Sequence, residues 1–164
     1  MMTTKLTMFG NVDIWGLPKV AFLSSDKFSP SSVLKCYDWA VEMKKTNKCV
    51  LSGFLSKLEI DVLDILLTGT QPIVMVLARG MYDRVPPKLK SHVESGRLLL
   101  VSPFSPSCKQ VTRDQAKLRN QLVIDNAAEI VFAHIYPGGM LAQLKIPKGT
   151  SLTVLDDSNM GVER

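Results

Sequence analysis

Short, continuous apolar runs recur along this chain and alternate with longer amphipathic segments. The run at 73–77, Ile-Val-Met-Val-Leu, is the clearest of them. Strands that are buried on both faces of a parallel sheet have this composition, because helices cover the two faces. The alternation therefore predicts an α/β fold: a three-layer, doubly wound and mainly parallel sheet whose crossovers are right-handed.

Capping signals place the starts of the expected helices. Ser29 precedes Pro30 as an N-cap with proline in the first turn, and Ser56 with Glu59 matches a capping box. A second match, Thr112 with Gln115, predicts a helix to about residue 126, and a shorter helix is expected at 86–96. The strands are expected at 20–23, 49–51, 73–77, 98–101, 130–133 and 152–155. We expect a short lead-in before residue 19 and a polar, frayed end at 156–164.

Composition narrows the class of protein. Of the 164 residues, 46% are hydrophobic and 21% are charged, as in an ordinary soluble globular protein. We expect a single domain over 1–164, with its core at about 19–156. Lys and Arg number 20 against 15 Asp and Glu, so the formal net charge is +5. This excess favours anionic partners such as nucleotides or nucleic acid, although scattered lysines give the same total.

The cysteines and the start of the chain bear on its location. Cys36, Cys49 and Cys108 are an odd number without C-x-x-C spacing, which favours buried thiols over disulfides or a zinc site. The first ten residues lack the apolar stretch of a signal peptide, and no apolar run approaches the ~20 residues that cross a bilayer. We therefore expect a cytoplasmic protein with no membrane partner, no metal and no cofactor.

Small and hydroxyl-bearing residues follow the expected strands. In a parallel sheet these loops open on one edge, where backbone N–H groups form nests for anions. Arg79 is the one strong cation among the loops, and small neighbours let a ligand approach the backbone. The residues that we expect to bind a phosphate-bearing ligand are Ser24, Ser25, Ser52, Gly53, Arg79, Gly80, Arg119, Asn120, His134, Gly138 and Gly139.

The pair Arg119-Asn120 and the triplet Pro137-Gly138-Gly139 carry most of the phosphate signal. A helix-borne arginine offers a planar fork of donors that suits phosphate, and glycines expose backbone N–H groups. An arginine that pairs with a carboxylate at the edge of the core is the alternative, with nearly equal weight. For His134, at the end of a strand, a structural role is equally compatible with its position.

Signatures of common enzymes are missing from the sequence. There is no G-x-x-x-x-G-K-[ST], no G-x-G-x-x-G after the first strand, no G-x-S-x-G and no H-E-x-x-H. Glu59 could face the ligand site as a carboxylate, but capping the helix explains its spacing better. We therefore predict binding and assign no catalytic residue.

Several of these pieces together resemble one family. Val20 to Ser25 with Ser29, then Ser52-Gly53, the strand at 73–77, and Arg119-Asn120 follow the order of the DNA-processing protein A family (DprA, also called Smf). That family belongs to a wider Rossmann-like group with the LOG proteins, once described as lysine decarboxylases. The resemblance runs from about Lys19 to Leu144. It implies a Rossmann-like fold, a homodimer, and binding of single-stranded DNA during DNA uptake and recombination.

The chain also departs from both branches of that group. Asp26 stands where the DprA family has a turn arginine, and its glycine-rich segment is shortened here to Pro137-Gly138-Gly139-Met140. The LOG motif P-G-G-x-G-T-x-x-E continues here as Met140-Leu141-Ala142-Gln143-Leu144, without the Gly-Thr pair and the glutamate. We therefore expect a nucleotide-binding or single-stranded nucleic-acid-binding protein that is not catalytic. The alternative is a LOG-like nucleoside 5'-monophosphate phosphoribohydrolase with a displaced carboxylate, Glu59 or Glu129.

Overall fold

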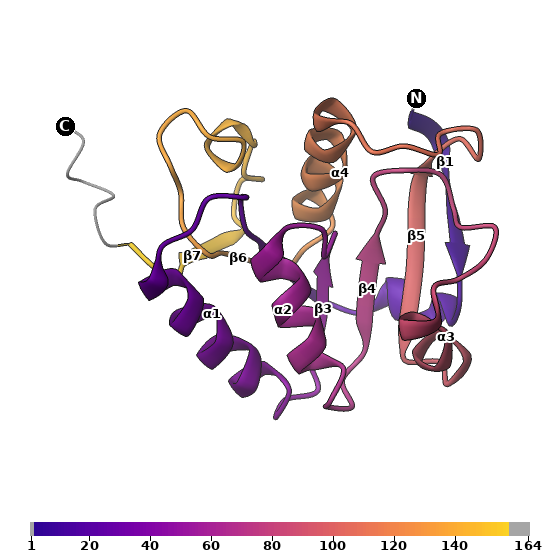
Figure 1. The fold of residues 1–164 in the computed structure, drawn as a ribbon, viewed down its shortest axis with the longest axis horizontal. Coiled ribbons are helices and arrows are strands. Elements are labelled where there is room, and N and C mark those ends of the chain that lie inside the picture. Colours follow the sequence, from indigo (N-terminus) through magenta and orange to yellow (C-terminus); the bar gives the residue numbers. More distant parts are fainter. Residues whose placement is uncertain (1, 158–164) are drawn as a thin grey trace.

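In the computed structural model, which describes residues 2–157, seven strands form one sheet in the order β1-β5-β4-β3-β2-β6-β7 (Figure 1). All neighbouring strands are parallel except β1, which runs antiparallel to β5. The mainly parallel sheet predicted from the apolar runs is therefore confirmed. The strands are β1 Met2–Phe9, β2 Lys19–Leu23, β3 Cys49–Ser52, β4 Ile73–Val76, β5 Leu98–Phe104, β6 Glu129–Phe132 and β7 Ser151–Val154.

Helices cover both faces of the sheet and complete the three layers. One face packs against α1 (Pro30–Met43), α2 (Lys57–Leu66) and α3 (Pro87–Glu94). The other face packs against α4 (Arg113–Asp125) and the 3₁₀ helix η1 (Val12–Gly16). Each face has its own apolar cluster, because alternate side chains of every strand point to opposite sides. The doubly wound, three-layer arrangement predicted from the sequence is therefore confirmed.

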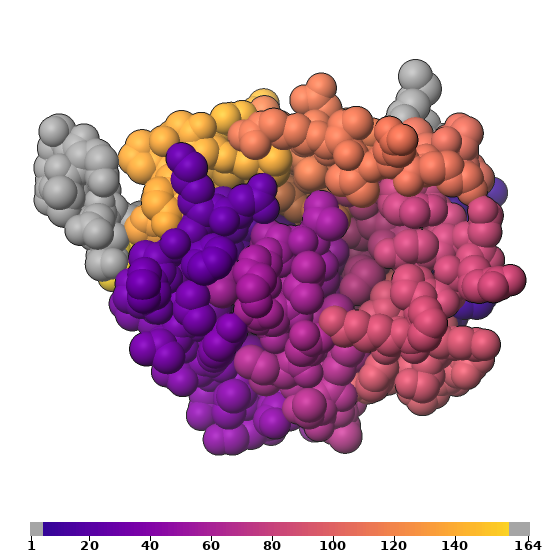
Figure 2. Space-filling model, in the orientation of Figure 1, coloured from indigo at the N-terminus to yellow at the C-terminus, as the bar shows by residue number. Residues whose placement is uncertain are grey.

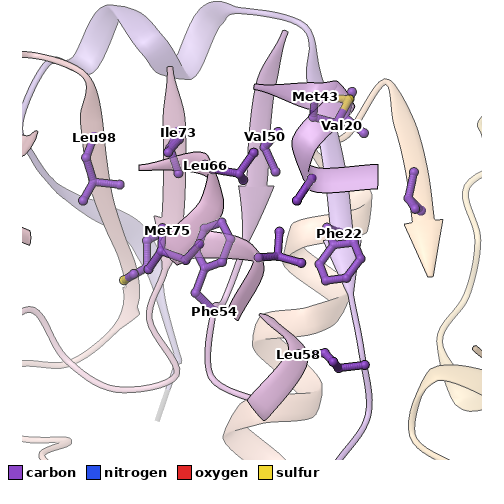
Figure 3. Packing of buried hydrophobic residues seen from close by; sticks show 14 of the residues in the cluster. Val20, Phe22, Met43, Val50, Phe54, Leu58, Leu66, Ile73, Met75 and Leu98 are labelled. Atoms are coloured by element: carbon purple, nitrogen blue, oxygen red, sulfur yellow. The ribbon is translucent and has the colours of Figure 1, made fainter. Parts of the chain in front are cut away.

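The cluster under α1 and α2 shows how the helices are fixed on the sheet (Figure 3). Phe22 of β2 is fully buried and stacks on Trp39 of α1, with ring centroids 4.9 Å apart. Leu58 and Leu66 of α2 are fully buried in the same cluster. Burying such side chains contributes roughly 1.5–3 kcal/mol each, so this packing holds the first turn of α2 at the carboxyl edge of the sheet.

The predicted helix caps are present. The Ser29 hydroxyl accepts from the Ser32 backbone N–H, and Ser56 and Glu59 form the full, reciprocal capping box. Thr112 also caps its helix by accepting from the backbone N–H of Gln115. The Gln115 amide, however, donates to the carbonyl of Ala78 at 2.9 Å, so this side chain ties α4 to the end of β4.

The expectation for the N-terminal segment is wrong. The residues before 19 form the edge strand β1, in register with β5 from Thr7↔Ser102 to Phe9↔Leu100, and the helix η1 follows. The expectation for the C-terminal segment is wrong at Asp156, which is 1% exposed and accepts hydrogen bonds from hydroxyls of α1. Residues 158–164 lie outside the part of the chain that the structure describes.

The buried thiols predicted for α1 and β3 are confirmed. Cys36 and Cys49 are at most 2% exposed, and burial raises the pKa of each thiol to about 12. Cys108 is half-buried in the connection between β5 and α4. Across residues 2–157, no helix has the length and apolar character needed to span a membrane.

Candidate ligand site at the strand switch point

The strand order places a crevice between the carboxyl ends of β2 and β6. These two strands are neighbours, in register from Val20↔Glu129 to Leu23↔Phe132, but the chain leaves β2 towards β3 and leaves β6 towards β7. Ligands of doubly wound sheets bind at such a switch point, since the connecting loops diverge there and leave an opening.

A pocket of about 470 Å³ occupies this crevice, and we call it the switch-point pocket. Loops after β2 and β6 meet the first turn of α2 and the inner face of α4 at the upper edge of the molecule in Figure 2. The pocket is lined by Ser24, Ser25, Asp26, Lys27, Leu55, Ser56, Glu59, Arg113, Ala116, Arg119, Asn120, Tyr136, Pro137, Gly138, Gly139, Met140 and Leu141. Its volume lies within the roughly 300–1,000 Å³ typical of small-molecule sites.

Arg119 is the buried cation of this edge. Its side chain is 2% exposed; Nη1 donates to the carbonyl of Val76 at 2.9 Å and Nε to Oδ1 of Asn120 at 2.8 Å. The guanidinium lies directly against Gly53, where an added Cβ would come within 2.6 Å of Nε. Burial lowers the pKa of Arg119, and the nearby Glu59 carboxylate opposes that shift. Arg119 thus reaches from α4 across the ends of β3 and β4.

Asn120 presents its amide to the pocket. Oδ1 is taken by Arg119, so the side chain is oriented with Nδ2 towards the loop that follows β6. There Nδ2 donates to the Met140 sulfur at 3.3 Å. A thioether is a weak acceptor, so this buried donor has only a weak partner in the wall of the pocket.

The glycine pair shapes the opposite wall. Gly138 has φ +75°, which favours glycine, and an added Cβ there would meet nothing within 4 Å. The Gly139 N–H closes a turn onto the carbonyl of Tyr136 at 2.9 Å. Because Gly138 and Gly139 have no side chains, a ligand in the pocket can approach their backbone.

Glu59 uses both carboxylate oxygens on the backbone around it. Oε2 accepts from the N–H of Ser24 at 2.9 Å, while Oε1 accepts from Leu55 at 2.9 Å and Ser56 at 3.3 Å. The carboxylate is 2% exposed, and it joins the end of β2 to the start of α2. Capping therefore explains Glu59, as the sequence indicated, and the same contacts place it in the pocket wall. The Ser24 N–H is consequently engaged by a carboxylate of the protein itself.

The charged residues at the opening of the pocket are not among the phosphate-binding residues predicted from the sequence. Lys27 and Arg113 are exposed and line the opening from the β2–α1 loop and the start of α4. Asp26 lines the same opening. Arg113 begins α4, and the position of this helix over the switch point brings Arg113 to the pocket.

A second, smaller pocket lies beside the first and is mainly apolar; we call it the apolar pocket. It has a volume of about 230 Å³ and lies over the ends of β3 and β4, between α2 and the segment before α3. Arg79 faces this pocket, with its guanidinium 4.9 Å from the Tyr82 ring centre and Nε donating to the Gly80 carbonyl at 3.1 Å. Its lining is Gly53, Phe54, Leu55, Ile60, Leu63, Met75, Leu77, Ala78, Arg79, Tyr82, Pro86, Lys88, Leu89, Val111 and Arg119.

The structure thus divides the predicted site residues into three groups. Six of them line the switch-point pocket: Ser24, Ser25, Arg119, Asn120, Gly138 and Gly139. Gly53 and Arg79 line the apolar pocket, which Arg119 also borders. Ser52, Gly80 and His134 line neither pocket.

The three remaining residues have structural contacts. The Ser52 hydroxyl accepts from the Phe54 N–H at 3.2 Å, which stabilises the turn after β3. Gly80 packs against the backbone of residues 105–106, where a Cβ would not fit. His134 Nδ1 is hydrogen-bonded to the Asp156 carbonyl, and its ring meets Tyr136 edge-on at 4.4 Å. The structural alternative for His134 agrees with these contacts.

Glu129, one of the two displaced carboxylates considered for hydrolysis, begins β6 and lies at the opposite edge of the sheet from the pocket. It pairs there with Lys48, whose Nζ is 3.5 Å from Oε2. A group at the amino end of β6 does not reach a ligand at the carboxyl end.

Comparison with known proteins shows that this chain is similar in fold to several solved structures. No family model and no curated protein matches the sequence. The structure of DprA from Streptococcus pneumoniae superposes with a TM-score of 0.62 at 18% identity, over 77% of this chain and 45% of that one. DprA from Helicobacter pylori, described by its single-stranded DNA binding mode, gives 0.62 at 19%, over 79% and 60%.

A third solved structure is less similar in fold and in sequence. The molybdenum cofactor binding protein from Rippkaea orientalis gives a TM-score of 0.52 at 9% identity, over 77% of this chain and 67% of that one. The present chain spans about half the length of the pneumococcal protein and three fifths of the Helicobacter one. The DprA-like, Rossmann-like fold expected from the resemblance is therefore confirmed.

Proposed function

We propose that this chain binds single-stranded nucleic acid, or a nucleotide, by holding a phosphate group in the switch-point pocket, and that it does so without catalysis. The observation that carries the proposal is the Asn120 amide, a buried donor aimed into the pocket with a thioether as its partner. A phosphate oxygen is a far stronger acceptor than sulfur, so a bound anion would improve this hydrogen bond.

The surroundings of Asn120 support an extended anionic ligand. Exposed Lys27 and Arg113 stand at the opening, where they can approach phosphates on either side of one held inside. The net charge of +5 favours the approach of a polyanion. The fold similarity to a Helicobacter pylori protein described as binding single-stranded DNA favours that polymer among the anions.

The carboxylates near the ligand support binding over hydrolysis. Glu59 faces the pocket, but its two oxygens already accept three backbone N–H groups, so the protein itself engages this carboxylate. Glu129 lies at the far edge of the sheet. These contacts support the proposal of binding over the LOG-like alternative.

The test is fluorescence anisotropy with a labelled oligothymidylate at several salt concentrations. Asn120→Asp keeps the oxygen that binds Arg119 and replaces the donor Nδ2 with an acceptor. A hydrogen bond to a charged group contributes about 1.5–3 kcal/mol, so we expect affinity to fall at least tenfold. Removing the rim charges with Lys27→Gln and Arg113→Gln should weaken binding and flatten its dependence on salt.

Lys45→Gln is the matched control for the rim, since Lys45 is an exposed lysine just beyond the end of α1, at the other edge of the sheet. It should leave the affinity within about twofold, because the 14-residue helix α1, about 21 Å long at ~1.5 Å per residue, separates Lys45 from the carboxyl edge and the Debye length is only about 8 Å. Wild-type affinity in Asn120→Asp, with the protein still folded by circular dichroism, would refute the proposal.

The wider role is part of the same proposal. A homodimer in the cytoplasm that acts in DNA uptake or recombination agrees with the resemblance to DprA. Native mass spectrometry of the purified chain, with and without oligonucleotide, measures the assembly directly, and a monomer in both samples would remove the homodimer from the proposal.

A further inference from the structure

The apolar pocket adjoins the switch-point pocket across a shared wall. Two residues, Leu55 and Arg119, line both of them. Leu55 belongs to the β3–α2 loop and Arg119 to α4, so the wall is built from opposite sides of the carboxyl edge. In Figure 2 the surface is hollowed between α2, in magenta, and the segment before α3, in pink, where the apolar pocket lies.

The two pockets differ in chemistry. The switch-point pocket is bordered by serines, glycines, Asn120 and charged residues. The walls of the apolar pocket are the side chains of Phe54, Leu63, Met75, Leu77 and Leu89. At about 230 Å³ it is smaller than the roughly 300–1,000 Å³ of sites that hold a whole small molecule. Its size and lining therefore suit one flat, apolar part of a ligand that is anchored elsewhere.

The mouth of the apolar pocket exposes large hydrophobic side chains to water. Leu55 is 47% exposed, Val111 42% and Ile60 37%; Leu55 and Ile60 belong to the β3–α2 loop and the first turn of α2, and Val111 to the loop before α4. Exposed hydrophobic side chains that gather around a pocket mark a binding surface more often than singly scattered ones do. A ligand that enters here would cover all three.

We propose that the apolar pocket receives the base of a nucleotide whose phosphate lies in the switch-point pocket, with Arg119 between the two. This inference rests on the function proposed above. A base has a flat π-face that packs on apolar walls, and a planar guanidinium stacks on such a face while it attracts phosphate. The pair of pockets thereby selects strands with unpaired bases, because a paired base is not free to enter.

The experiment compares two oligonucleotides of equal length and charge: an oligothymidylate and a strand of the same length with abasic sites throughout. Both present the same phosphates to the switch-point pocket, so the ratio of their dissociation constants reports the base alone. For the wild type we expect the oligothymidylate to bind on the order of tenfold more tightly. The double variant Ile60→Ser/Val111→Ser should bring this ratio to about twofold or less and leave abasic binding unchanged.

Val41→Ser is the matched control, since Val41 on α1 is 37% exposed, as Ile60 is, and lies outside both pockets. Val111→Ser alone, in the loop before α4, provides a milder variant if the double one unfolds, and it should lower the ratio by about half or more. A wild type that binds neither strand refutes the proposed function itself. A wild type that binds both equally, or a variant that keeps the tenfold ratio, refutes the base subsite alone.

Discussion

Gly53 and Arg119 form a close fit at the carboxyl edge of the sheet. The guanidinium occupies the space that any side chain at position 53 would need, and its Nη1 satisfies the carbonyl at the end of β4. Since Arg119 is 2% exposed, its hydrogen bonds and the nearby Glu59 carboxylate compensate for burying the charge. The orientation of Asn120 depends on the same guanidinium, because Nε holds its Oδ1.

Gly53→Ala should therefore destabilise the protein by displacing Arg119. Loss of the bond to the Val76 carbonyl should cost about 1.5–3 kcal/mol in the free energy of unfolding, measured by urea denaturation. Oligonucleotide binding should weaken as well, because Asn120 loses its support. Gly16→Ala is the control, since a Cβ at Gly16 meets nothing within 4 Å, and it should change stability by less than about 0.5 kcal/mol.

A double-mutant cycle separates the clash from other effects of the added methyl group. In an Arg119→Met background the guanidinium is gone, so Gly53→Ala should cost far less than it does in the wild type. Equal costs in the two backgrounds would mean that the methyl group and Arg119 do not compete for space.

The start of α1 is braced by the segment that follows β7. Oδ2 of Asp156 accepts from the hydroxyls of Ser29 at 3.1 Å and of Ser31 and Ser32 at 2.8 Å, and Oδ1 is 3.4 Å from Lys35 Nζ. A carboxylate at this end also complements the helix dipole. The contacts connect the last strand of the sheet to its first parallel crossover.

Asp156→Ala should destabilise the fold by about 2–3 kcal/mol, because three hydroxyls and the helix end lose a buried, charged acceptor. Guanidinium denaturation followed by circular dichroism measures the change. Asp157→Ala removes the exposed carboxylate next in sequence and should stay within about 0.5 kcal/mol of the wild type. If the two variants are equally stable, the hydroxyl contacts of Asp156 do not hold α1.

Elements with a strong local signal could be predicted, and those with a weak one could not. The strand at 73–77 and the caps at Ser29 and Ser56 each have a local physical cause, and all of them are present. The search for continuous apolar runs does not identify β1, because polar and apolar residues alternate along this strand. Lys5 and Thr7 are exposed, and Leu6 and Met8 are half-buried. That period of two is itself the signal of a half-buried edge strand and would have identified it.

At the scale of the whole molecule, the site could be predicted only as far as strand order allows. Parallel strands predict that all strand-end loops share one edge, and Ser24 after β2 and Gly138 after β6 do meet there. Which loops lie side by side depends on the order of the strands in the sheet. The apolar pattern of the sequence does not reveal that order. Because β3 separates β4 from β2, the Arg79 loop lies over the apolar pocket instead of beside Ser24.

The two faces of the sheet offer a test of whether the molecule opens as one unit. Cys36 lies in the cluster under α1 to α3, and Cys49 in the cluster under α4. Both are at most 2% exposed, and a pKa of about 12 keeps the thiols protonated and unreactive in the folded state. Modification by an alkylating reagent therefore requires that the layer over each thiol opens.

In a Cys108→Ser background, we expect Cys36 and Cys49 to be alkylated at the same rate and with the same dependence on denaturant, read by peptide mass spectrometry. The shared sheet makes global unfolding the common route to both thiols. The labelling should be done at about pH 8, below the ordinary thiol pKa. As the pH rises from the ordinary thiol pKa of 9.0 towards about 12, thiols of the unfolded chain ionise while the folded ones do not, so the free energy of unfolding falls. Faster labelling of Cys49 would show instead that the layer of α4 and η1 opens separately from the other layer.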